Sequence, residues 1–447
     1  MKSSTIIAPA RNNSLLKMCN ILPNCKSAIL SGALILVAHG VALCAGAIDT
    51  TTRSFDPKFR TLTVTRNDNL MADPVLTLSD PADRLTISFD ELTEDRSYLR
   101  ARLIHCNADW QPSALSEPEY VEGFNQADIE DFGYSANTYV HYVNYKFSIP
   151  EEGLRPLVSG NYLLQIYDSD NPDTTLLQQR FRVSENSVAV NGHADGRTDR
   201  GFNSDLQQLE LALTPRGQVT YNPYADIFVE VLQNSRPDTS RILQTPSRMQ
   251  GQAIIYDHRS ELIFPAGNEY RRFETVRNNY PGMGVDHTAY EEPMYNAWLQ
   301  RSLPRDEGQY IFDQTQHGRF KIDEYNSTDP DLGADYILTH FSLEMEKLPD
   351  ADVYVEGDLT GRGYSDLNRM HYIDEEGIYA LSIPLKQGSY NFQYVAKPRI
   401  GNRPAEPGRI EGNHFETLNE YNTYVWLRTP GSRADRLVGS STIVATP

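Results

Sequence analysis

The residues that could carry chemistry in this chain are a histidine–cysteine pair and two groups of closely spaced carboxylates. His105 directly precedes Cys106, and such a pair can supply a general base and a nucleophile. The residues before them alternate between apolar and polar types, which predicts a β-strand, and neighbours on a strand point to opposite faces. The two side chains should therefore diverge, and structural roles are favoured for both.

The carboxylates could support metal binding or acid–base catalysis. The segment 168–175, DSDNPDTT, could place oxygens around calcium, but it lacks the glycine and terminal glutamate of an EF-hand loop, so a hairpin turn is favoured. Asp128, Glu130 and Asp131 lie at the tip of a long predicted loop, where carboxylates are usually solvated. After residue 47 there is no H-E-x-x-H, G-x-S-x-G, P-loop or Cys/His ligand spacing. The sequence therefore predicts no enzymatic activity, no metal ion and no cofactor.

The elements that position these residues are predicted to be β-strands. Apolar side chains occupy every second position in 85–89, 99–103 and 143–149, as in antiparallel strands with one face on a core and one in water. About seven such strands in residues 61–183 predict an immunoglobulin-like sandwich without the usual cysteine pair.

The rest of the chain also reads as β-structure. The alternation loosens over residues 188–348 and returns in the last hundred residues, where KQGSYNFQYV places a glycine turn before a strand. Helical periodicity is nearly absent. We expect an all-β fold of tandem β-sandwiches: an N-terminal immunoglobulin-like domain at 48–187, a middle β domain with long loops at 188–348, and a C-terminal β-sandwich at 349–447.

The first 47 residues have the composition of an export signal. They contain four basic residues and no Asp or Glu, followed by an apolar run over 28–41 and the triplet Ala45-Gly46-Ala47. We expect a signal peptide at 1–47 that is cleaved after Ala47, and a start at Met18 would give it better proportions. A retained membrane anchor and lipoprotein processing at Cys44 are the alternatives.

The charge of the remaining chain limits its partners. Removal of those four basic residues changes the formal net charge from −19 to −23. A polyanion repels phosphate backbones and anionic lipids, which disfavours nucleic-acid and membrane-surface roles. No later apolar run approaches the roughly 18 residues of a membrane helix, so no direct membrane insertion is expected. Cys106 is the only cysteine after residue 47, and we expect a free, buried thiol there.

The 104–137 loop, between two predicted strands, carries the candidate partner-binding residues. Loops of roughly thirty residues are usually functional or disordered, and disordered segments are poor in aromatic residues. This loop is rich in them: Trp110, Tyr120, Phe124, Phe132 and Tyr134. These rings should pack either on their own sandwich or on a protein partner, and the sequence leaves both open.

Several long strings of residues carry a resemblance to one family. They are HCNADW, EYVEGFN, IEDFGYSANT and SGNYLLQIY, then YNPYADIFVEV, FPAGNEYRRFE and ADYILTHFSL, and finally VYVEGDLT, LKQGSYNFQYV and IEGNHFETLNEYNTYVWLR. Together they resemble the plug protein family of the type IX secretion system of Bacteroidota, over nearly the whole chain after residue 47.

The resemblance implies a non-enzymatic, β-rich protein of the periplasm. Its partner would be the outer-membrane β-barrel translocon, whose periplasmic end it would bind and close. No small-molecule substrate is implied. The alternative is a periplasmic or surface glycan-binding protein, because residues 349–447 separately resemble early-set sandwiches of glycogen-active enzymes. That alternative needs two exposed coplanar aromatic rings, and Tyr364 stands where those sandwiches usually carry a tryptophan.

Overall fold

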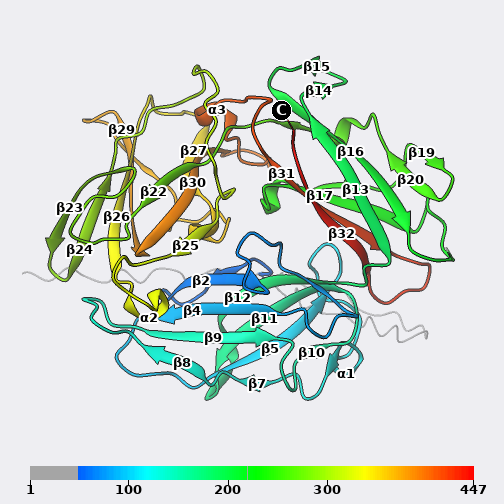
Figure 1. Cartoon of the computed structure of the whole chain (residues 1–447), viewed down its shortest axis with the longest axis horizontal. Helices are drawn as coiled ribbons and strands as arrows, with labels where there is room; N and C mark the ends of the chain where they lie inside the picture. Colours follow the sequence, from blue (N-terminus) through cyan, green and yellow to red (C-terminus); the bar gives the residue numbers. More distant parts are fainter. Residues whose placement is uncertain (1–48, 219, 447) are drawn as a thin grey trace, which may run out of the picture. The chain divides into compact units, whose positions relative to one another are not determined.

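The computed structural model describes residues 49–218 and 220–446. The expected signal peptide at 1–47 therefore lies outside the described residues. The described chain is built almost entirely from antiparallel sheets, which confirms the predicted all-β fold of tandem sandwiches (Figure 1). None of its few short helices is long and apolar enough to cross a membrane.

The first sandwich packs two sheets around a core whose residues run from Phe59 to Val183. One sheet has the order β1 (Arg53–Ser54), β12 (Asn171–Ser184), β11 (Gly160–Asp168), β5 (Leu99–Cys106), β7 (Ala127–Asp128), with β3 (Val75–Thr77) parallel to β12. The other has the order β2 (Phe59–Arg66), β4 (Leu85–Glu91), β9 (Val143–Ile149), β8 (Asp131–Tyr134). Helix α1 (Glu117–Tyr120) precedes a small ladder of β6 (Val121–Glu122) and β10 (Arg155–Pro156).

The second sandwich takes strands from two distant parts of the chain. One sheet has the order β13 (Val188–Asp195), β16 (Leu206–Pro215), β20 (Ala253–Tyr256), β19 (Arg248–Gln250), with β21 (Ile263–Pro265) on β16. The other has the order β18 (Arg241–Leu243), β17 (Ile227–Gln233), β31 (Glu420–Leu427), β32 (Arg436–Val444). A hairpin of β14 (Arg197–Thr198) and β15 (Gly201–Phe202) and two 3-10 turns, η1 (Pro237–Thr239) and η2 (Ser260–Leu262), complete it.

The third sandwich lies between those two parts in the sequence. One sheet has the order β22 (Arg271–Glu274), β30 (Gly388–Pro398), β25 (Phe320–Ile322), with β27 (Ala351–Glu356) also on β30. The other has the order β23 (Val285–Glu291), β24 (Met294–Leu299), β26 (Tyr336–Glu344), β29 (Ile378–Lys386), β28 (His371–Ile373). Helices α2 (Pro330–Gly333) and α3 (Gly408–Glu411) and the 3-10 turn η3 (Asp358–Thr360) belong to its connections.

The cores divide the chain differently from the expected ranges 188–348 and 349–447. The third core takes residues from Phe273 to Ile410, on both sides of the expected boundary. The second core combines residues from Val188 to Phe264 with residues from Tyr421 to Ala445. The cause is the pairing of β17 with β31, whose strands are drawn in green and red in Figure 1.

Buried ion pairs join the three sandwiches to one another. They are Asp90–Lys386 between the first and third at 2.8 Å, Arg182–Glu230 between the first and second at 3.4 Å, and Arg319–Glu420 between the second and third at 2.9 Å. Removing one partner of such a pair leaves an uncompensated buried charge, which is strongly destabilising. The sandwiches are therefore held together by contacts that are costly to separate.

Candidate partner-binding surface

The 104–137 loop is an ordered crossover between the two sheets of the first sandwich. Its strand β7 pairs with β5 in one sheet, and its strand β8 pairs with β9 in the other. Its first half also contacts the turn between β31 and β32, where Arg433 forms a bidentate ion pair with Glu119. That half of the loop is therefore partly covered by the second sandwich.

Two of the five candidate aromatics are buried in the first sandwich. The guanidinium carbons of Arg180 and Arg182 lie 4.1 Å and 5.0 Å from the centre of the Trp110 ring, which also packs in a small core cluster with Cys106. The Tyr120 hydroxyl donates a hydrogen bond to the Leu103 carbonyl oxygen at 3.2 Å. These rings support the fold and present little surface to a partner.

Phe124 is the most exposed of the five, with 96% of its surface accessible. Gly123 and Asn125 on either side of it both have positive φ, 106° and 52°. The Asn125 side chain is buried and accepts a hydrogen bond from the Leu103 amide at 2.8 Å while donating one to the Leu103 carbonyl at 2.9 Å. The loop is thus tied down beside Phe124, and the phenyl ring is left in solvent.

Phe132 and Tyr134 form a surface cluster with residues from another part of the chain. The rings of Phe132 and Tyr134 meet edge to face with centroids 5.9 Å apart. The Arg96 guanidinium carbon lies 4.4 Å from the Phe132 ring centre and 4.5 Å from that of Tyr98. We call Arg96, Tyr98, Phe132 and Tyr134 the aromatic ridge. Tyrosine and arginine are enriched in protein interfaces and among their energetic hot spots.

Sequence reasoning found two members of the ridge and missed the other two. Arg96 and Tyr98 precede β5, outside the 104–137 loop, and no local pattern links them to β8. The link comes from β9, because the Ser97 amide donates a hydrogen bond to the Tyr145 hydroxyl at 2.8 Å, and Tyr145 pairs with Phe132. Only the folded structure shows that Arg96 and Tyr98 lie beside β8.

The histidine–cysteine pair is structural. His105 contacts the Ser113 hydroxyl through Nδ1 at 2.8 Å and the Ser159 carbonyl through Nε2 at 3.1 Å, and burial lowers its pKa. The predicted free, buried thiol is confirmed for Cys106, and burial raises the pKa of this thiol to about 12. A buried thiol with such a pKa stays protonated and is a poor nucleophile.

The carboxylate groups do not converge on a metal site. Asp168 caps the turn between β11 and β12 by accepting a hydrogen bond from the Asp170 amide at 2.8 Å. Asp128 pairs with Arg100 at 2.6 Å on the surface. Among residues 49–218 and 220–446, no three His, Cys, Asp or Glu side chains are grouped as metal ligands would be.

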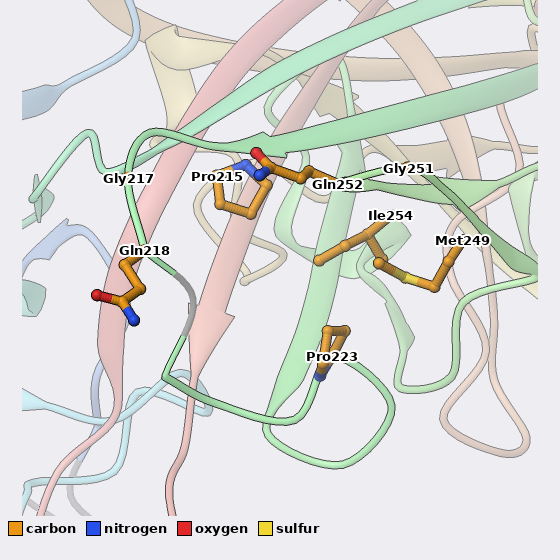
Figure 2. A pocket seen from close by; sticks show the side chains of 8 residues that line it. All are labelled: Pro215, Gly217, Gln218, Pro223, Met249, Gly251, Gln252 and Ile254. Atoms are coloured by element: carbon orange, nitrogen blue, oxygen red, sulfur yellow. The ribbon is translucent and has the colours of Figure 1, made fainter.

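Two hollows lie on the described surface, and they differ in their lining. One of about 290 Å³ lies between the loop after β16 and the β19–β20 hairpin. Figure 2 shows its lining side chains, with Gln218 and Pro223 on the loop and Met249 and Ile254 on the hairpin. Its lining includes no acid, base or nucleophile. A second, of about 320 Å³, lies beside β3 and includes the polar side chains of Asp80 and Arg155.

The three tryptophans lack the open faces that a glycan platform would need. Trp110 lies beneath two arginines, and Trp426 is fully buried. Trp298 is stacked between His287 and His340, whose ring centroids lie 4.5 Å and 4.7 Å away at interplanar angles of 6° and 13°. Sugar stacking requires a free aromatic face, so these side chains do not favour the glycan-binding alternative.

Comparison with known proteins gives a matching family model and a similar solved structure. A family model described as the type 9 secretion system plug protein 1st domain matches residues 59–185. The crystal structure of a hypothetical protein from Parabacteroides merdae has a TM-score of 0.87 and 36% sequence identity, covering 89% of this chain and 100% of that chain. No curated protein matches the sequence.

Two further solved structures that match are much less similar. An N-terminal region of an enterococcal surface protein has a TM-score of 0.20 and 8% identity, covering 89% of this chain and 97% of that chain. The BSP domain of a biofilm associated protein has a TM-score of 0.20 and 7% identity, covering 90% of this chain and 61% of that chain.

Proposed function

Because the chain belongs to the type IX secretion system plug protein family, we propose that it is a non-enzymatic plug that binds and seals the periplasmic end of the outer-membrane translocon barrel. Family membership is the observation that carries the proposal. A pore wide enough for folded cargo leaks when it is empty, so a folded protein of comparable size is a suitable stopper. The proposed location is the periplasm, where the partner would hold the protein next to the outer membrane.

The joined sandwiches suit this role mechanically. A stopper that opened between its domains would let solutes pass, so its domains must stay together. The Asp90 carboxylate accepts hydrogen bonds from Lys386 Nζ and from the Tyr336 hydroxyl, each at 2.8 Å, and Asn144 donates a third at 2.8 Å. A buried charge with this many partners disfavours separation of the first and third sandwiches.

The aromatic ridge and Phe124 are the proposed contact with the barrel on the first sandwich. They replace the full set of five aromatics expected from the sequence, because Trp110 and Tyr120 are buried. Tyr98, Tyr134 and Phe124 are exposed, whereas Phe132 is partly buried against the core of the first sandwich. Exposed aromatic side chains supply large contact areas that become energetic anchors when a partner excludes water from them.

Capture of the barrel and closure of its pore test the proposal. The tagged mature protein should retain the translocon barrel from detergent-solubilised outer membrane, and the purified barrel in a planar lipid bilayer should conduct less when the plug is added. If the barrel is not retained and its conductance does not change, the plug function is excluded.

The ridge is tested with a matched pair of substitutions. Tyr98→Ala should weaken barrel binding by at least about 1 kcal/mol, a cost that only a minority of interface residues exceed. Tyr325→Ala is the control, because 65% of the Tyr325 surface is accessible, against 66% for Tyr98. Tyr325 also contacts an arginine, since the Arg277 guanidinium carbon lies 3.5 Å from its ring centre. Equal affinities for the two variants would exclude the ridge as the contact while leaving the plug function intact.

A further inference from the structure

Residues 300–319 form a long connection from β24 to β25 without a regular helix or strand. Connections of more than about 12–15 residues without secondary structure are uncommon in compact domains and are usually functional or disordered. Disorder does not describe this one, because two buried carboxylates hold it against the rest of the protein. These are Glu269 and Glu411.

Glu411 anchors the first part of the connection. Its Oε2 accepts a hydrogen bond from Arg305 Nε at 2.8 Å, and Arg305 Nη2 donates to the Glu269 carbonyl oxygen at 2.7 Å. Burial alone would raise the pKa of Glu411, but Arg271 and Arg305 together hold it below its ordinary value. The carboxylate is therefore charged at neutral pH and holds both arginines.

The Glu269 carboxylate and Arg272 anchor the second part. The Tyr310 hydroxyl donates to Glu269 Oε1 at 2.8 Å, and the Thr315 hydroxyl donates to Oε2 at 3.3 Å. Between these two anchors, Asp313 forms an ion pair with Arg272 at 2.7 Å. The chain is thus fixed on both sides of the two residues Ile311 and Phe312.

Ile311 and Phe312 nevertheless point into solvent, with 79% and 62% of their surfaces accessible. Burying such side chains away from water is favourable, so leaving both exposed forgoes a considerable stabilisation. The residues on either side of these two side chains are fixed. Ordering the two side chains further when a partner binds would therefore cost little conformational entropy. Preorganised apolar side chains of this kind are suited to binding.

A third exposed apolar side chain lies on an adjoining element of the second sandwich. The Tyr310 ring contacts the His414 ring with centroids 5.9 Å apart, and the Phe415 amide donates to the Ser204 carbonyl at 3.3 Å. Ser204 follows the β14–β15 hairpin, whose Phe202 is 73% exposed. We call Phe202, Ile311 and Phe312 the apolar tips.

The charge around the apolar tips restricts the partner. Asp306 and Glu307 are exposed in the same connection. Burial, Glu269 and Glu416 together raise the pKa of Tyr310, so Glu416 is a third acidic group near this part of the connection. The acidic groups lie beside Ile311 and Phe312, whereas the exposed Arg197 lies opposite Phe202 on the β14–β15 hairpin. The acidic groups disfavour an anionic lipid surface at Ile311 and Phe312. They complement a protein surface whose apolar patch is bordered by lysine or arginine.

The size of the tips indicates one contact among several. Three such side chains offer on the order of 500 Å², still below the roughly 800 Å² per partner of a stable interface. A self-complementary dimer held by this connection alone would be too small. A partner that touches the protein elsewhere as well is required.

We infer that the apolar tips are a second contact with the wall of the translocon barrel, on an apolar patch with a basic border. This inference rests on the proposed plug function. A seal needs contact around the circumference of a pore, and the aromatic ridge supplies such contact from the first sandwich alone. The tips supply it from the second and third sandwiches, which the buried ion pairs hold to the first.

The test compares the double substitution Ile311→Ser/Phe312→Ser with the control Ile400→Ser, an exposed apolar residue elsewhere on the third sandwich. The probe is the purified translocon barrel, used first in solution for affinity and then in a planar bilayer for conductance. The double variant should bind at least about fivefold more weakly, a loss that only a minority of interface residues exceed. It should also leave a residual current that the wild-type protein and the Ile400→Ser variant block.

The other outcomes overturn the inference in distinguishable ways. If the double variant binds and seals like the wild type while Tyr98→Ala does not, the tips are not a contact and the plug function stands. If the wild-type protein itself neither binds nor seals, the plug function fails and the inference fails with it. If light scattering shows a wild-type dimer that the double variant lacks, the tips bind a second copy of the chain instead.

Discussion

The role assigned to Trp110 changes once its neighbours in the fold are known. In sequence it is one of five aromatics in an acidic loop, and in the fold it packs beneath Arg180 and Arg182, which belong to β12. Burial and the neighbouring Arg182 lower the pKa of Arg180 to about 10, so both arginines remain charged at neutral pH. A cation over an indole ring is favourable, more so when water is excluded.

We predict that Trp110→Ala destabilises the protein whereas Phe124→Ala does not. Loss of the buried indole should lower the free energy of unfolding by about 3–5 kcal/mol, the usual cost of removing a buried large aromatic side chain. Phe124 is exposed, and surface substitutions usually change stability by less than about 0.5 kcal/mol. Urea denaturation of both variants measures the difference, and equal midpoints would contradict the placement of the two rings.

Cys106 gives a second prediction at the residue scale. Because its thiol is buried and the pKa of that thiol is raised to about 12, reaction with a thiol reagent at pH 8 should be slow in the native protein. The same reaction should be fast after denaturation in urea. The Cys106→Ala variant should not react under either condition. Rapid labelling of the native wild-type protein would contradict the burial.

At the scale of elements, the connection 300–319 predicts a dependence on pH. The pKa of Glu411 is held below its ordinary value of 4.5 in the folded protein, so its ionised form stabilises the fold. That stabilisation is fully present above the unfolded-state pKa, near 4.5, and is lost as the pH falls through the lowered folded-state pKa. The anchored connection should therefore loosen in acid.

Hydrogen exchange and limited proteolysis at residues 300–319 measure this loosening. We expect Glu411→Gln to weaken the anchor at pH 7 and to remove most of the change between pH 6 and pH 3. The matched control is Glu119→Gln, which breaks an exposed pair with Arg433 far from this connection in the sequence. An identical acid response in Glu411→Gln and the wild-type protein would show that other groups hold the connection.

Alternation along the chain predicts the longer strands of the first sandwich but not its short ones. Strands such as β4 and β9 bury every second residue, which a local pattern records. Strands β7 and β8 have two and four residues, too few for a period, and each pairs with a different sheet. The candidate surface is built at these short strands, so its residues could be named from sequence only in part.

At the scale of the whole described chain, the buried pair of Asp90 and Lys386 predicts a large effect of a single charge. Lys386→Met should lower the free energy of unfolding by about 3–5 kcal/mol, because Asp90 would remain buried without its counter-charge. Lys347→Met is the control, since Lys347 pairs with Asp374 on the surface, where pairs contribute about 0–1 kcal/mol.

The double variant Asp90→Leu/Lys386→Met separates charge from packing. It should recover most of the lost stability, since replacing both members of a buried pair with apolar residues is often neutral. Hydrogen exchange should show that Lys386→Met loosens β4 of the first sandwich together with β29 of the third. Loosening of β29 alone would mean that the pair does not couple the two sandwiches.

The division of the chain among its cores could not be predicted from local patterns. The string around Tyr421 and Val425 reads as a strand in any sandwich, and the last hundred residues look like one domain because their strands follow each other closely. Its pairing with β17 is a contact between residues far apart in sequence, as in Ile227 with Leu427. Such pairing depends on three-dimensional complementarity that no window of sequence contains.

The split second sandwich has a consequence for the order in which the protein folds. In the proposed export to the periplasm, residues 188–266 arrive before β31 and β32, so β17 is without the neighbour that covers one of its edges. Domains generally fold as units in the order of synthesis, and the third sandwich is complete while the second is still open. During that interval the apolar side chains of Val229 and Val231 lack part of their cover. A chain that ended before Glu420 would therefore present an incomplete sheet with an uncovered edge. Chaperones retain and proteases remove proteins with such surfaces. Only a chain that continues through β32 would be released as a closed protein.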